Sequence, residues 1–275
     1  MKWLRFILSH SIFISVCAAA LCYQTSSLLG INPPVMLYLM VFSFTLAGYN
    51  MYWLLTRYSL SSAGTVKFFS HNISNVLLIF VSGIIALYGL ITLFYLWPVL
   101  IAGMFLTGLY SMPLWPFEWA KKHRRFGLLK TSLLAFTWSF ITISLPVYHQ
   151  AFIFVDVLWL FFARFFFMMM LCSIFDSRDS KIDLLNSLHS LATDVSKSAL
   201  RVIMVVFFIL FIFAGIQLRL LIHKPGQVTA FIFTGIIALW VYWLSLKPRG
   251  YIFYYFVVDG LMLLSAIFTF VAGYL

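Results

Sequence analysis

Long apolar stretches separated by short polar ones make up almost the whole chain. Because about 20 apolar residues in a helix cross the hydrocarbon core of a bilayer, they read as membrane spans. Only 9% of the residues are charged, against about 25% in a soluble domain, so the chain cannot cover a water-facing surface. The predicted spans lie near 6–29, 35–56, 73–94, 97–112, 128–148, 151–175, 199–222, 228–246 and 251–273.

We therefore expect an all-α fold, a polytopic membrane helix bundle of about nine transmembrane helices that forms a single integral-membrane domain over residues 1–275. This composition excludes a secreted enzyme, a cytosolic domain and a nucleic-acid-binding protein. The first span resembles a signal peptide, because basic residues precede it. Its apolar run continues to Leu29, however, which favours a retained span.

The basic residues predict the orientation of the bundle. The chain has 18 Lys and Arg residues but only 7 Asp and Glu residues. If the N-terminus is cytoplasmic, all of these basic residues except Arg164, Arg219 and Lys224 fall in or beside cytoplasmic segments. The positive-inside rule then favours a cytoplasmic N-terminus and an external C-terminus.

Three acidic residues stand close together in the stretch FDSRDSKID, at the cytoplasmic end of the sixth span. On a helix, Asp176, Asp179 and Asp183 would share an arc of roughly 60°, with Arg178 and Lys181 elsewhere on its surface. Carboxylates at this spacing repel one another, and a divalent cation such as Mg²⁺ would bring them together. The alternative is an ordinary polar segment in which the two basic residues offset the acids.

Three cytoplasmic segments resemble the UbiA superfamily of intramembrane prenyltransferases, which are helical bundles of about nine spans. The Asp176-x-x-Asp179-x-x-x-Asp183 pattern is similar to the second aspartate motif of that family. The first motif falls at Tyr49-Asn50, and "RRFGLLK" with Lys130 and "DSRD" are similar to segments of a divergent bacterial branch. The resemblance therefore implies a bacterial inner-membrane protein.

The resemblance implies Mg²⁺-dependent transfer of a prenyl group from a prenyl diphosphate to a lipophilic, membrane-soluble acceptor. Asp176, Asp179 and Lys130 would act in catalysis, and Asp176, Asp179 and Asp183 would hold the metal. The residues implied to bind the diphosphate are Asn50, Arg57, Tyr110, Lys121, Arg124, Arg125 and Arg178. For each basic residue, the alternative is an anchor on anionic lipid.

The first motif departs from the family pattern. Active members carry Asn-Asp-x-x-Asp-x-x-x-Asp, whereas Asn50 is followed at those positions by Met51, Leu54 and Tyr58. One set of metal-binding carboxylates is therefore missing. The second hypothesis is a non-catalytic protein of the same fold that binds a lipid diphosphate or a protein partner. A transporter is a weaker third reading, because we find no internal repeat with paired broken helices.

Two charged residues, Arg164 and Asp259, fall within predicted spans, where each needs a partner or a wet cavity. We expect them to pair with each other, or Arg164 to reach the substrate cavity. The cysteines Cys17, Cys22 and Cys172 are expected to be inert membrane thiols, because they lack metal-binding spacing. The histidines form no facing pair within the spans, which argues against b-type haem.

Overall fold

The computed structural model describes residues 2–59, 65–111, 127–150, 154–185, 189–222 and 226–274. Across these ranges every regular element is helical, and eight helices are long and apolar enough to cross a membrane. The prediction of a helical membrane bundle is thereby confirmed. The long helices are α2 (Ile12–Leu29), α3 (Val35–Ser59), α5 (Ile73–Thr92), α8 (Gly127–Val147), α9 (Phe154–Leu185), α11 (Lys197–Ile222), α12 (Gly226–Ser245) and the continuous pair η4 (Phe253–Val258) and α13 (Asp259–Ala272).

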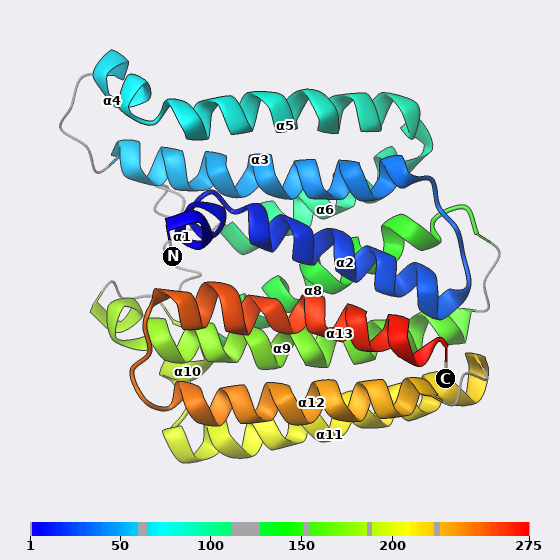
Figure 1. Ribbon diagram of the computed structural model, residues 1–275. Helices are drawn as coiled ribbons and strands as arrows, with labels where there is room; N and C mark the ends of the chain where they lie inside the picture. Colours follow the sequence, from blue (N-terminus) through cyan, green and yellow to red (C-terminus); the bar gives the residue numbers. More distant parts are fainter. Residues whose placement is uncertain are drawn as a thin grey trace.

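The long helices lie side by side (Figure 1). Helix α3 packs between α5 and α2, and α2 also contacts α13 and α8. Helix α9 packs against α8 and α11, while α12 contacts both α11 and α13. The two termini lie at opposite ends of the bundle, as Figure 1 shows.

The predicted span at 97–112 corresponds to helix α6, which is shorter than the other membrane helices. Helix α6 (Trp97–Ser111) has 15 residues, so it is about 22 Å long, less than the roughly 30 Å of the hydrocarbon core. The short helix η1 (Phe94–Leu96) precedes it. The other short elements are α1 (Lys2–Ser9), α4 (Thr65–His71) and α10 (Leu191–Asp194).

The predicted span at 6–29 is wrong as a single helix, because the chain breaks between α1 and α2. Ser11 at the break has a left-handed backbone with φ 59°, which interrupts the helical hydrogen-bond ladder. In a membrane protein a carbonyl group freed in this way needs another donor. The side-chain Nδ2 of Asn50 on α3 donates to the His10 carbonyl at 2.8 Å, and also to the Leu46 carbonyl at 2.8 Å.

Helix α9 is the centre of the core. Its residues Met168–Leu171 are nearly inaccessible, and they belong to a cluster that also includes residues of α2, α8, α11, α12 and α13. At 32 residues the helix is about 48 Å long, and it continues ten residues beyond the predicted end at 175. The three cysteines are buried and unpaired in disulfides, as expected.

Candidate functional site

A cavity of about 510 Å³ is lined by residues of α1, α2, α3, α6, α8, α9, η4 and α13. It lies toward the end of the bundle that carries α1 and α10 (Figure 1). This size is typical of a small-molecule site. Charged side chains from four helices reach its lining, and these are Arg57 on α3, Lys130 on α8, Asp176, Arg178, Asp179 and Asp183 on α9, and Asp259 on α13.

The character of the lining changes along the bundle axis. On α8 the lining passes from Lys130 to Leu134 and Trp138, and on α9 it passes from Asp176 back to Met168. Met262 follows Asp259 on α13. One end of the cavity is therefore charged and the other apolar, which suits a ligand with a polar head and an apolar chain.

The three carboxylates of α9 share a helix face, as the spacing predicts, and all line the cavity. Thr131 Oγ1 on α8 donates to Asp176 Oδ2 at 2.5 Å. Arg178 forms a bidentate ion pair with Asp179, with both N–O distances 2.7 Å. In the described part of the chain, no group of three or more His, Cys, Asp or Glu residues is placed to hold one metal ion.

Aromatic rings hold the Arg178 guanidinium group in place. Its Cζ lies 5.0 Å from the ring centroids of Phe175 and Tyr254, and 5.2 Å from that of Tyr255. Cation–π attraction to three rings adds to the ion pair with Asp179. Arg178 is therefore a fixed positive charge at the cavity wall, whereas the spacing alone placed it away from the acids.

A polar clamp between α8 and α10 positions Lys130 and Thr131. Asp194 accepts a hydrogen bond from the Gly127 backbone N–H at 2.9 Å, and its other oxygen lies 2.7 Å from His189 Nδ1. The Gly127 backbone packs so closely against Ser190 that a Cβ atom there would overlap the Ser190 backbone. Only glycine fits at this close approach, so the start of α8 is fixed against α10.

The structure brings most of the predicted site residues together. Arg57, Tyr110, Lys130 and Arg178 line the cavity with the three aspartates. Asn50 is buried and does not line the cavity. Its amide group instead donates a hydrogen bond to the His10 carbonyl at the break between α1 and α2. Its neighbour Tyr49 does line the cavity. Three predicted diphosphate-binding residues lie outside the described residues, namely Lys121, Arg124 and Arg125.

The sequence analysis missed several cavity residues. Ser9 and Ser11 reach the cavity because α1 and α2 are separate helices. The polar triplet Ser9-His10-Ser11 inside an apolar run was the available signal for that break. Thr131 also lines the cavity, next to the predicted Lys130. Asp259 also lines the cavity, although the sequence analysis expected it to pair with Arg164.

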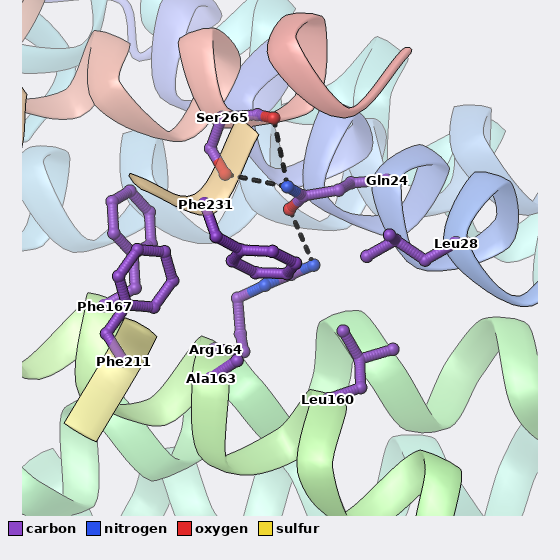
Figure 2. A pocket seen from close by; sticks show the side chains of 9 residues that line it. All are labelled: Gln24, Leu28, Leu160, Ala163, Arg164, Phe167, Phe211, Phe231 and Ser265. Atoms are coloured by element: carbon purple, nitrogen blue, oxygen red, sulfur yellow. Dashed lines mark hydrogen bonds between the residues drawn. The ribbon is translucent and has the colours of Figure 1, made fainter. Parts of the chain in front are cut away.

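The predicted pairing of Arg164 with Asp259 is wrong. Figure 2 shows the Arg164 side chain pointing from α9 toward Gln24 on α2, and its Nη2 donates to Gln24 Oε1 at 2.8 Å. Nη1 donates to Thr142 Oγ1 at 2.9 Å and to the Leu21 carbonyl at 3.2 Å. These partners are neutral. The alternative expectation was that Arg164 reaches the substrate cavity. Arg164 does not line the large cavity.

Gln24 extends this network, which already joins α2, α8 and α9, to α13 as a fourth helix. Its Nε2 donates to the Ser265 carbonyl at 3.1 Å, to Ser265 Oγ at 2.7 Å and to Thr269 Oγ1 at 2.8 Å (Figure 2 shows the Ser265 contacts). A void of about 10 Å³ lies beside Arg164, enough space for about one water molecule. We assign this cluster a structural role, in which a buried cation is solvated by neutral groups.

Comparison with protein-family models, curated proteins and solved structures finds no match to this chain. Membership of the UbiA superfamily therefore stays a prediction from the motifs at the charged end of the bundle. The helical bundle and the cavity are properties of this chain itself.

Proposed function

We propose that the protein is a UbiA-like membrane prenyltransferase, whose cavity binds a prenyl diphosphate and whose second substrate is a lipophilic acceptor. One observation carries the proposal. The aspartates of α9 and the basic residues of α3, α8 and α9 surround one end of a cavity whose other end is apolar. In this arrangement the diphosphate lies at the charged end and the prenyl chain extends along Leu134, Met168 and Leu171.

The charge of the cavity favours a role for Mg²⁺. Its described lining holds four carboxylates, those of Asp176, Asp179, Asp183 and Asp259, against the three cations of Arg57, Lys130 and Arg178. The formal balance is therefore −1, which opposes binding of a diphosphate. Oxygen ligands on α9 suit Mg²⁺, which commonly links one or two carboxylates to a substrate phosphate. When bound, the ion would offset the negative charge that collects on the departing diphosphate.

The protein's own cations have a defined part in this reaction. The bond between the allylic carbon and the diphosphate oxygen breaks, and its electron pair leaves with the oxygen. The acceptor supplies the electron pair of the new bond to that carbon and releases a proton. Lys130, Arg57 and Arg178 lie in the cavity wall, where fixed positive charge stabilises the diphosphate as it leaves.

Binding of geranyl, farnesyl and longer prenyl diphosphates to the purified protein, with Mg²⁺ or with EDTA, tests the proposed site. Asp176→Asn or Asp179→Asn should weaken Mg²⁺-dependent binding at least about tenfold, roughly 1.4 kcal/mol. Asp156→Asn is the matched control, because Asp156 lies on the same helix about 30 Å away. Binding that is indifferent to EDTA, or unchanged in both α9 variants, would refute the metal site.

The second candidate is a non-catalytic protein that binds a lipid diphosphate in the same cavity. The first motif favours it, because Met51, Leu54 and Tyr58 supply no carboxylates and the Asn50 amide is bonded to backbone carbonyls. Release of diphosphate together with a prenylated product separates the two functions. Tight binding without turnover across a broad panel of acceptors would favour the non-catalytic protein.

A further inference from the structure

The buried guanidinium group of Arg164 has no counter-charge in the described part of the chain. Only 3% of Arg164 is exposed, and the ion pairs that the described residues form involve other side chains. All its hydrogen-bond partners are neutral. A cation that is kept out of water by neutral partners alone is costly within a membrane helix. Its surroundings therefore favour a negatively charged group beside it.

A small cavity lies directly beside this cation. Its volume is about 10 Å³, and its polar lining consists of Gln24, Arg164 and Ser265 (Figure 2). The rest of the lining is aliphatic or aromatic, and none of these residues lines the large cavity. This volume admits one occupant of about the size of a water molecule. Phosphate, sulfate and carboxylate groups are too large for it.

The polar lining offers hydrogen-bond donors. Arg164 binds its neutral partners through Nη1 and Nη2, and its Nε–H group has no acceptor among the residues that the structure describes. Ser265 Oγ accepts a hydrogen bond from Gln24 Nε2 at 2.7 Å, and no described atom accepts the hydrogen of its own hydroxyl group. The acceptor in the lining, Gln24 Oε1, already binds Arg164. Two donors, one of them on a cation, are therefore available to a ligand.

These features favour an anion over a water molecule. A water molecule carries two hydrogens that need acceptors, whereas the lining presents donors and apolar groups. A halide ion accepts several hydrogen bonds, has no hydrogen of its own and supplies the missing charge. Chloride is the commonest halide in biological fluids and is little larger than a water molecule.

We infer that Arg164 and Ser265 bind a single chloride ion in this cavity. The ion neutralises the cluster in which Arg164 and Gln24 join α2, α8, α9 and α13. Chloride is therefore a structural ligand of the bundle. The site goes beyond the proposed function, because it shares no lining residue with the cavity assigned to the prenyl diphosphate.

Thermal unfolding of the purified full-length protein in a non-ionic detergent tests the inference. Chloride is replaced by gluconate at constant ionic strength, because gluconate is too large for the cavity. In gluconate the cation keeps only its neutral partners. Chloride at ten times its dissociation constant should raise the Tm by about 3 °C, since a ligand that binds only the folded state stabilises it. Bromide should act as chloride does.

Three variants locate the effect. Arg164→Met removes the cation, so its Tm should not depend on chloride. Ser265→Ala keeps the cation but removes one donor to the anion, so it should need about tenfold more chloride for the same shift. This variant decides the matter if Arg164→Met does not fold. Arg201→Met is the matched control, because Arg201 is an exposed cation on α11, and it should keep the full response.

Two results would overturn the inference. An equal Tm of the wild-type protein in chloride and in gluconate at every concentration would mean that the cavity holds water. An unchanged chloride response in folded Arg164→Met, or in Ser265→Ala, would mean that chloride binds elsewhere on the protein.

Discussion

Replacing Gln24 should destabilise the bundle more than replacing the buried charge that it solvates. The Gln24 amide group joins α2 to α9 through Arg164, and to α13 through Ser265 and Thr269. Gln24→Leu removes both links and leaves the cation with fewer partners. Arg164→Met removes the cation itself, together with the cost of keeping it out of water.

The hydrogen bonds give the expected magnitudes. Gln24→Leu loses one hydrogen bond to a charged group, about 1.5–3 kcal/mol, and about two neutral ones at about 0.5–1.5 kcal/mol each, for a total of about 4 kcal/mol. Arg164→Met leaves the Gln24 oxygen without its donor, which costs about 1–3 kcal/mol. Removing a buried cation without a counter-charge offsets other losses. We expect a net cost of about 2 kcal/mol for Arg164→Met.

Reversible unfolding in SDS, followed by circular dichroism, measures the free energy of unfolding of each variant. In the double variant, Gln24→Leu should cost about 2 kcal/mol less than it does alone, because the cation is absent. A control cycle of Arg164→Met with Asp259→Asn should be additive within about 0.5 kcal/mol, since the two residues do not interact. If Arg164→Met is the more destabilising single change, the buried cation is a net stabiliser and the reasoning is wrong.

Three further predictions concern the break, the clamp and the orientation. Asn50→Leu should lower the free energy of unfolding by about 1–3 kcal/mol, because it leaves the His10 carbonyl unpaired in the bundle; a smaller loss would mean that another donor replaces the amide. Gly127→Ala should lower the free energy of unfolding by more than about 2 kcal/mol, because the added methyl group overpacks the contact with Ser190. Gly48→Ala is the control, because a Cβ atom there meets nothing, and it should stabilise α3 by up to about 1 kcal/mol. The same unfolding assay measures both variants. Reporter fusions should place residue 190 in the cytoplasm and the C-terminus outside, and a cytoplasmic C-terminus would contradict the predicted orientation.

Hydropathy was sufficient to predict the helical bundle and most of its helix positions. A run of apolar residues long enough to cross a bilayer identifies a helix without tertiary information. The three aspartates of α9 were also predictable, because a helical period of 3.6 residues alone places them on one face. Hydropathy was less informative for α6, which is apolar but, at 15 residues, shorter than the about 20 residues that cross a bilayer.

Partners across the bundle were not predictable from the sequence. Opposite charge suggested that Arg164 pairs with Asp259, but the register of α2, α8 and α9 instead brings three neutral oxygens and a backbone carbonyl to the guanidinium group. The role of Asn50 likewise depends on the backbone break between α1 and α2, which a hydropathy pattern does not reveal. Such contacts follow from how helices dock, and a single sequence with no tertiary information does not fix that docking.

The break at Ser11 has a practical consequence for handling the protein. Helix α1 supplies Leu8 and Ser9 to the cavity wall, so the first residues of the chain form part of its enclosure. An affinity tag or a deletion at the N-terminus would therefore disturb the wall of the cavity. The last residues of α13 lie at the end of the bundle opposite to α1 (Figure 1), and none of α13 beyond Met262 lines the cavity. Purification tags and immobilisation chemistry therefore belong at the C-terminal end.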